Sequence, residues 1–362
     1  MIRNSLLVFF CIISFITSAQ HSLPVSDENQ ASESEEFNPT EVIMHHIADS
    51  HYWNLWSVKD ETTGEEKYTS IPLPVILIAN GNLDIFLSSE FHHGKHPVVK
   101  GDRTYLMHLG KIYLADEKGE ITYDEENNVT NIKPLDFSIT KNVVGMMVAA
   151  ILVLLIFTSV ARKYKKNPGR PKGLQSFMEP LIIFVRNDIA IPNIGEHKYQ
   201  KYLPYLLTVF FFILINNIMG LIPILPGGAN VTGNIAVTLT LAVLTLLITN
   251  FSGNRAYWRH IFAAPGVPIW LYPIMIPVEL IGVISKPFAL MIRLFANITA
   301  GHIIVLSLVS LIFIFKTIWI SPVSIAFVLF MDCLELLVAF LQAYIFTLLT
   351  ALFIGMAVQE HH

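Results

Sequence analysis

A few ionisable and amide side chains stand inside two long apolar stretches near the C-terminal end of the chain. They are Glu279, Lys286, Arg293, Asn297, His302, Asp332, Glu335 and Gln342. Polar groups inside membrane segments are costly and usually functional. Arg293 stands out, because a guanidinium keeps its proton in a protein and the next 22 residues carry no charge, only His302. The ordinary alternative is a side chain that snorkels to the membrane surface, but a position deep inside such a long stretch disfavours it. We therefore expect Arg293 to need an anionic partner, fixed or visiting.

Residue spacing places several of these groups on one face. Glu279, Lys286 and Arg293 recur every seven residues, which puts them on one helical stripe, and Asn297 follows Arg293 by one turn. We expect residues 274–315 and 323–358 to form an antiparallel hairpin that turns at 316–322.

Counting from that turn predicts which residues lie level. His302 lies 14 residues before Lys316 and Glu335 lies 13 after Pro322, so these two side chains should meet and could share a proton. Arg293 and Gln342 should be level within about one turn. The expected arrangement is a proton relay, with His302 and Glu335 on the external side of Arg293 and Glu279 on the cytoplasmic side.

Composition indicates that these groups sit in a membrane protein. The 362 residues are 53% hydrophobic and 14% charged, with a mean hydropathy of +0.54, whereas soluble domains carry about 25% charged residues. Apolar runs at 142–161, 202–222, 234–251, 274–315 and 323–358 are each long enough to cross a hydrocarbon core of ~30 Å. We predict an all-α polytopic fold with about five membrane-embedded helices, the last two forming a long, tilted hairpin.

Positive charges predict the orientation of these helices. Six of them follow the first run: Arg162, Lys163, Lys165, Lys166, Arg170 and Lys172. Such clusters mark the cytoplasmic side, so the preceding region should be external or periplasmic and the C-terminus cytoplasmic. Residues 174–191 mix apolar and charged side chains, which suits a helix lying in the cytoplasmic interface.

The N-terminal part of the chain has a different composition. Residues 1–19 resemble a cleaved signal peptide, with an uncleaved anchor helix as the alternative. Residues 20–140 hold 21 of the 28 acidic and 8 of the 24 basic residues, a formal net charge of −13. Residues 20–40 read as a disordered linker. A small β-rich domain should follow over about 41–135, with one hairpin turning at Asn80-Gly81 and a second joining 111–115 to 121–124. We thus divide the chain into 1–19, an external acidic region 20–140 and a membrane domain 141–362.

One segment carries a specific family resemblance. The run from Pro287 to Asn297, PFALMIRLFAN, resembles the signature of subunit a of F-type ATP synthases, in which an Arg-Leu-Phe-x-Asn core is nearly diagnostic. Further matches are LQAYIF from Leu341, NIMGLIP from Asn217 and PVEL from Pro277, in the family's order across 175–358. The resemblance does not cover residues 20–140, and relatives generally have a much shorter external N-terminus.

The resemblance implies a role for each candidate residue. Arg293 is similar to the essential arginine beside the rotor carboxylates, and Asn297 and Gln342 to its polar neighbours. His302 and Glu335 resemble the paired half-channel residues, and Glu279 an acid of the cytoplasmic path. Many bacterial members carry the acid and the histidine of this pair in exchanged positions. Gly220 stands where many relatives carry an acid.

The resemblance also implies partners and a location. The partners are the c-ring, the peripheral-stalk b subunits, other ATP synthase subunits, the lipid bilayer and the transported proton, in the inner membrane of a bacterium. The chain has no phosphate-binding Gly-rich loop with Lys-Ser/Thr, so we do not expect it to hydrolyse nucleotide itself. No cofactor, resident metal or nucleic-acid partner is expected, and the choice between H⁺ and Na⁺ stays open.

Two other function classes compete with this interpretation. A secondary transporter would also carry intramembrane charges, but it usually shows an internal repeat, and we find none. An anchored external binding protein could use histidines as zinc ligands, either His92, His93 and His96 or His45, His46 and His51. Neither set has a recognised zinc spacing, which favours solvated loop histidines.

Overall fold

The described part of the chain divides into two compact units. The computed structural model describes residues 39–358, except 60–65, 117–118, 126–127, 167–171, 223–227, 263–267 and 316. Residues 48–146 belong to one unit, and residues 39–47, 147–221 and 230–358 belong to the other. The predicted signal peptide, residues 20–38 of the predicted linker and Arg170 lie outside the described residues.

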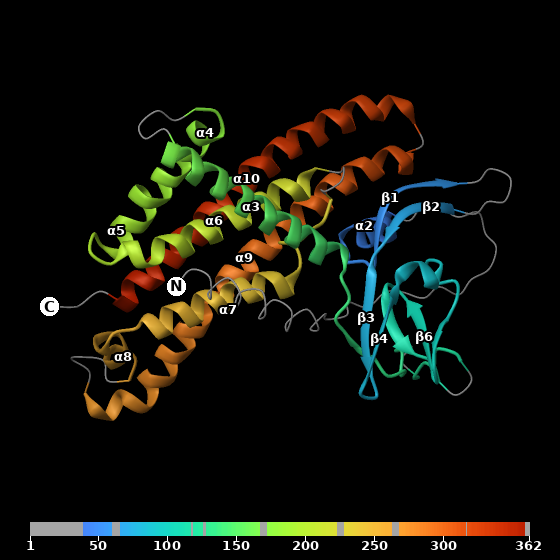
Figure 1. Ribbon diagram of the computed structural model, residues 1–362, viewed down its shortest axis with the longest axis horizontal. Coiled ribbons are helices and arrows are strands. Elements are labelled where there is room, and N and C mark those ends of the chain that lie inside the picture. Colours follow the sequence, from blue (N-terminus) through green and yellow to red (C-terminus); the bar gives the residue numbers. More distant parts are fainter. Residues whose placement is uncertain are drawn as a thin grey trace. The chain divides into compact units, whose positions relative to one another are not determined.

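The first unit contains short antiparallel strands, as the sequence predicts. The strands are β1 (Tyr52–Lys59), β2 (Glu66–Pro72), β3 (Pro74–Ala79), β4 (Asn82–Leu87), β5 (Val98–Lys100), β6 (Arg103–His108), β7 (Lys111–Leu114) and β8 (Leu135–Asp136), with a 3-10 turn over Ser88–Phe91. They form sheets ordered β1-β2, β4-β3-β8 and β5-β6-β7 (Figure 1). Alternate residues of β3 point inward, and they pack with Phe86, Phe91 and Tyr105 in the core.

The predicted hairpin at Asn80-Gly81 is confirmed. Asn80 and Gly81 have φ of 52° and 78°, the conformation of the two-residue turn whose twist matches the flanking strands. The turn pairs Ala79 with Asn82 and continues the register along β3 and β4.

The second predicted hairpin is wrong. Strand β7 pairs with the preceding strand β6 through a turn at Leu109-Gly110, whose φ angles are 48° and 74°. Tyr123, in the segment that was expected to pair with β7, instead forms a bridge with Val129. Leucine rarely adopts positive φ because its Cβ crowds the backbone, so Gly110 alone signals this turn. Glu117 and Lys118 of the predicted turn lie outside the described residues.

The remaining elements are helical. They are α2 (Pro39–Ile47), α3 (Lys141–Lys166), α4 (Leu174–Phe184), a π-helix (Val185–Ala190), α5 (Ile191–Ile194), α6 (Tyr199–Leu221), α7 (Ile235–Ser252), α8 (Arg255–Phe262), α9 (Tyr272–Phe315) and α10 (Ser321–Val358), with 3-10 turns at Ile269–Leu271 and Ile318–Ile320. Within the described ranges, α3, α6, α7, α9 and α10 are long and apolar enough to cross a membrane. Each of the five predicted apolar runs forms one of these helices. Helix α2 was not predicted; it packs against α9.

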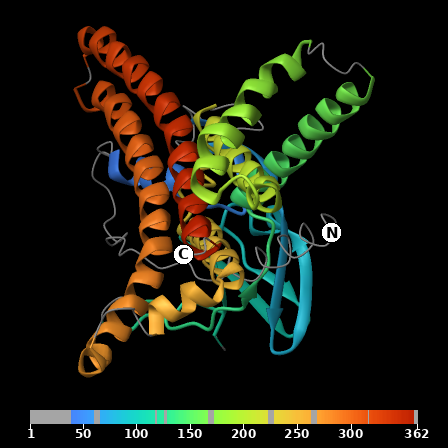
Figure 2. The same cartoon turned by 90° about the vertical axis from the view of Figure 1, so that its left-hand side faces the viewer.

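Helices α9 and α10 form the predicted hairpin. They lie side by side in both views (Figures 1 and 2), and near the tip the Ser324 hydroxyl donates to the Leu308 carbonyl. With 44 and 38 residues they extend over ~66 Å and ~57 Å at 1.5 Å per residue. Few residues of α9 are fully buried within the described part of the chain.

The C-terminal half of α10 is fixed by close contacts with other helices. A Cβ on Gly355 would lie 2.0 Å from the Asn193 carbonyl oxygen, so only glycine permits this approach to α5. At the end of α10, Lys198 Nζ donates to the Val358 carbonyl at 2.7 Å and the Asn254 N–H donates to the Ala357 carbonyl at 2.9 Å. These donors satisfy carbonyls that a helix end leaves open, and the Lys198 charge complements the helix dipole.

Candidate functional site

Arg293 lies on an outward face of α9. Leu290, Met291 and Leu294 are buried against the bundle, whereas Arg293 and Asn297 are exposed. In the part of the chain that the structure describes, no carboxylate lies within ion-pair distance of Arg293. The guanidinium is therefore available to a group outside this chain.

Glu335 of α10 reaches α9 at the position of Gly301. A Cβ added to Gly301 would lie 2.4 Å from Glu335 Oε1 and 3.0 Å from its Cδ. Since Gly301 directly precedes His302, the carboxylate stands at the level that counting from the hairpin tip predicts. Its Oε1 is buried and has no hydrogen-bond partner among the described residues. A buried orphan acceptor of this kind marks Glu335 as a candidate functional residue.

Gly301 is a site residue that the sequence analysis missed. Glycine inside a helix is unfavourable by about 1 kcal/mol relative to alanine, so its presence mid-helix was a signal for a close approach. The close approach here is that of the Glu335 carboxyl group.

Gln342 differs from Arg293 in how exposed it is. Its side chain is only 2% exposed, whereas Arg293 points outward. The two residues are on facing helices of the hairpin, but the structure does not place their side chains on one common surface. One turn before Gln342, the Ala339 carbonyl accepts from Asn217 Nδ2 at 3.3 Å.

Buried amides and a hydroxyl lie at the end of α6 and in the segment that leads to α7. They belong to Asn216, Asn217, Asn230 and Thr232. The Thr232 hydroxyl donates to Asn217 Oδ1 at 2.6 Å, while Asn216 Oδ1 and Asn230 Nδ2 have no partner in the described structure. Orphan polar atoms in a buried setting favour bound water. The signal in the sequence was several Asn residues flanking an otherwise apolar run.

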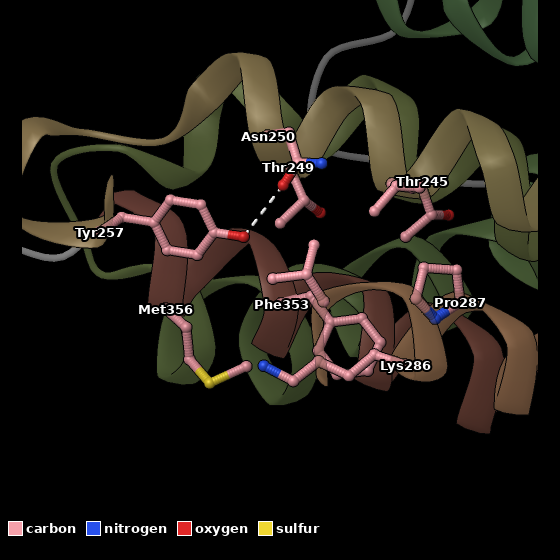
Figure 3. Close-up of a pocket in the computed structure, with 10 residues that line it drawn as sticks. Thr245, Thr249, Asn250, Tyr257, Lys286, Pro287, Phe353 and Met356 are labelled. Atoms are coloured by element: carbon pink, nitrogen blue, oxygen red, sulfur yellow. Dashed lines mark hydrogen bonds between the residues drawn. The ribbon is translucent and has the colours of Figure 1, made fainter. Parts of the chain in front are cut away.

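A small cavity lies among α7, α8, α9 and α10 (Figure 3). Its volume of about 20 Å³ is close to what one water molecule needs. The Tyr257 hydroxyl donates to Asn250 Oδ1 at 3.0 Å, and the buried Thr249 hydroxyl has no partner among the described residues. Lys286, two turns before Arg293, also lines the cavity, and its Nζ lies 5.8 Å from the centre of the Phe353 ring.

The histidines of the first unit do not form a metal site among the described residues. No group of three or more His, Cys, Asp or Glu side chains is arranged for a metal there. The His93 ring stacks on Tyr52 at 4.3 Å, and the His92 and His96 rings meet edge to face. Burial, followed by the nearby His92 and Lys95 charges, lowers the pKa of His93.

The comparisons with known proteins cover the helices that carry these residues. The family model described as ATP synthase A chain matches residues 143–355, which is more than half of the chain. The chain belongs to the ATP synthase A chain family. All six candidate residues, Glu279, Arg293, Asn297, His302, Glu335 and Gln342, fall inside the matched range.

Two relatives in this family illustrate the extent of the match. ATP synthase subunit a of Chloroherpeton thalassium is 53% identical over 235 residues, covering 63% of this chain and 69% of that protein. ATP synthase subunit a 2 of Chlorobaculum tepidum is 53% identical over 61% of this chain and 64% of that protein. The chain thus spans about two thirds of the length of these relatives.

The acidic N-terminal region also has counterparts. A domain of unknown function (DUF8433) matches residues 42–137. ATP synthase subunit a of Chlorobium phaeobacteroides strain DSM 266 is 43% identical over 76% of this chain and 82% of that protein. That share exceeds what residues 143–362 hold, so the match reaches into the N-terminal region. The expectation that relatives have a much shorter N-terminus is therefore wrong for this member of the ATP synthase A chain family.

Proposed function

We propose that this chain is the proton-conducting stator subunit of a rotary ATP synthase, with Arg293 facing carboxylates on a rotating ring. As a membrane-sector subunit it is not the part that makes or hydrolyses ATP. The ring, the peripheral-stalk b subunits and the other subunits of the complex are its proposed partners, and the proton its proposed cargo.

One observation carries the proposal: Arg293 is exposed in the middle of a long apolar helix and has no carboxylate partner among the described residues. A guanidinium facing hydrocarbon without an anion would be strongly unfavourable. A visiting carboxylate on a neighbouring subunit resolves this, and apolar side chains exposed beside it, such as Phe288 and Ile292, suit a helical partner.

The chemistry follows from the environment of such a carboxylate. In lipid it is stable only when neutral, because desolvation raises its pKa. As it approaches Arg293, the positive charge favours ionisation, and the proton leaves into one aqueous path. The carboxylate must regain a proton from the other path before it returns to lipid. Arg293 also separates the two paths, because a fixed cation repels a passing proton.

Separate groups in the structure support the two proposed paths. On the proposed external side, the Glu335 carboxyl group stands beside Gly301, the residue before His302. The buried Asn217 amide donates to the Ala339 carbonyl, one turn before Gln342. On the cytoplasmic side, Glu279 lies on the Arg293 stripe, and the cavity beside Lys286 fits a water molecule. A proton that crosses 100 mV releases about 2.3 kcal/mol, which drives rotation.

The orientation belongs to the same proposal. The positive cluster that starts at Arg162 marks the cytoplasmic side, so residues 20–140 are external and the C-terminus is cytoplasmic. The chain is a multi-pass protein of a bacterial membrane, and we assign that membrane to the inner one.

Substitution of Arg293 tests the proposal directly. Membranes carrying Arg293→Ala should lose ATP-driven proton pumping, while the ATPase activity of the detached catalytic sector persists. Arg293→Lys should also fail, because lysine lacks the planar fork and the high pKa of arginine. Arg259→Ala, which removes an exposed arginine from α8, is the control and should pump normally. Normal pumping by Arg293→Ala would refute the assignment.

A further inference from the structure

An open groove of about 720 Å³ lies at the end of α3 that carries the positive charges. Arg162, Lys163 and Lys165 line one part of it, and Leu155, Ile156 and Leu174 line another. Its volume is within the range of ~300–1,000 Å³ typical of ligand sites. The lining therefore changes from apolar to cationic along a single helix.

The cations of this groove are not neutralised by the residues that the structure describes. All three are exposed, and no carboxylate of the described residues lies within ion-pair distance of them. They fall within four consecutive positions, so their charges add up over a small area. Such a site favours an anion from outside the chain.

An apolar stripe leads from the interior of α3 to these charges. Ile151 is 52% exposed and Leu155 is 59% exposed, and Arg162 lies on the same helical face because it follows Leu155 by two turns. That interval corresponds to about 10 Å along the axis. An amphiphile with its anionic group at Arg162 would thus lay its apolar part over Leu155 and Ile151.

The level of the groove in the bilayer fits this arrangement. The uncharged run 142–161 has the length of a hydrocarbon core and ends directly before Arg162. The cations therefore stand at the level of lipid phosphates. Basic pockets between helices on the cytoplasmic side are suited to anionic head groups.

We propose that this groove binds an anionic phospholipid, with its phosphate held by Arg162, Lys163 and Lys165 and an acyl chain lying along Leu155 and Ile151. Positive charge at this end also orients the helix, but that role requires charge alone. The groove combines charge with an apolar wall, and free inorganic phosphate would use only the first of these. This proposal does not depend on the role of Arg293.

Photolabelling of the assembled complex tests the proposal. The complex is placed in phosphatidylcholine nanodiscs containing a small fraction of phosphatidylglycerol with a photoactivatable acyl chain, and labelled residues are mapped by mass spectrometry. Label should appear on residues 151–156. Unlabelled phosphatidylglycerol should displace it, whereas additional phosphatidylcholine and millimolar inorganic phosphate should not.

Charge-removal variants make the test specific to the groove. Each removed cation should weaken labelling by roughly fivefold, so Arg162→Gln, Lys163→Gln and Lys165→Gln together should lower it by at least tenfold. Lys166, Arg170 and Lys172 remain to orient the helix. The control is Arg255→Gln with Arg259→Gln on α8, which should leave labelling within twofold of wild type.

Several results would overturn the proposal. These are unchanged labelling in the triple variant, equal displacement by phosphatidylcholine, displacement by inorganic phosphate, or no label on residues 151–156. The last result would show that a neighbouring protein subunit covers the groove. If the triple variant does not assemble, the competition series on the wild-type complex still decides between these outcomes.

Discussion

At the scale of single residues, the contact between Gly301 and Glu335 links the helix hairpin to the proposed chemistry. A carboxyl group partly buried between apolar helices keeps its position only if the facing helix leaves room for it. Gly301 leaves that room, and its neighbour His302 brings a second titratable group to the same level. The position of Glu335 thus depends on the absence of a side chain at Gly301 as much as on the side chains around it.

Gly301→Ala is expected to impair proton flow. The added methyl group would lie 2.4 Å from Glu335 Oε1, so the carboxyl group must leave its present position. Pumping by assembled complexes should fall at least severalfold, and Glu335→Asp in the same chain should restore part of it because aspartate is one methylene shorter. The control is Gly282→Ala, also in α9, where an added Cβ meets no described residue within 4 Å. Equal pumping by the two alanine variants would contradict the contact.

The His302–Glu335 pair is expected to work as a unit. Alanine at either position should lower proton flow strongly, because the remaining member has lost its proton-sharing neighbour. The exchanged variant, His302→Glu with Glu335→His, restores one acid and one base at the same level and should recover part of the flow. The measurement is passive proton conduction through membranes stripped of the catalytic sector. A double variant no better than the worse single variant would argue that the two groups do not cooperate.

Counting from the hairpin turn predicted the level at which Glu335 meets α9, because helical rise and a single turn determine which residues lie level. It did not predict which way each side chain faces across the bundle. Gln342 is buried while Arg293 is exposed, and this difference depends on how α10 packs against α6, which no local pattern encodes. Gly301 was missed for a related reason, since its importance lies in the residue opposite.

At the scale of elements, the start of α3 is stabilised by a residue far away in the sequence. Asp49 Oδ1 accepts from the Asn142 N–H at 3.1 Å, and Asp49 Oδ2 accepts from the Thr140 hydroxyl at 2.7 Å. Burial raises the pKa of Asp49, although hydrogen bonds from Thr140, Asn142 and Ser50 and the Lys141 charge oppose this. The folded state therefore binds the Asp49 proton more tightly than the unfolded chain does.

Asp49→Ala is expected to loosen the first turn of α3. Loss of a helix-capping acceptor costs about 1 kcal/mol, so amide hydrogen exchange at residues 142–146 should accelerate by roughly fivefold. Asp49→Asn keeps an acceptor and should lose much less.

The exchange rate should also depend on pH. Because the raised pKa makes the ionised form of Asp49 unfavourable, wild-type protection should decline as pH rises above 3.8 toward the folded-state pKa. Asp49→Asn should remove that decline. Asp102→Ala, at an exposed position, is the control; identical exchange in Asp49→Ala and wild type would contradict the capping role.

Elements were predicted correctly where an apolar run is long or where a turn contains a distinctive residue pair. The apolar runs located α3, α6, α7, α9 and α10 within a few residues, and Asn80-Gly81 located the β3-β4 hairpin. Helix α2 was missed because it is short and directly follows the acidic linker, and its packing against α9 is a tertiary contact. The β6-β7 hairpin was missed because Leu109 adopts a conformation that leucine rarely takes.

At the scale of the whole molecule, the acidic N-terminal region differs from the membrane helices in its charge and in its packing. Residues 20–140 carry a net charge of −13, and their strands close a core of their own around Tyr105 and Phe91. None of the candidate proton-transfer residues lies there. The region matches a domain model of its own, so we propose that it is a module separate from the proposed proton relay.

Deletion of this module is expected to leave pumping by assembled complexes intact. One variant joins residue 19 to residue 136, which keeps the proposed signal peptide and every span; a second removes only residues 50–135 and keeps α2, which packs against α9. Both remove most of the acidic strands, but neither removes a candidate proton-transfer residue. Both should therefore pump at near wild-type rates per assembled complex. The first should assemble less well, because it also loses α2 and the Asp49 cap of α3.

Proton pumping is normalised to the amount of complex, which is measured by quantitative mass spectrometry of a catalytic subunit. Loss of pumping in fully assembled complexes of both variants would show that the module gates or supplies the external proton path, and the division of labour proposed here would be wrong.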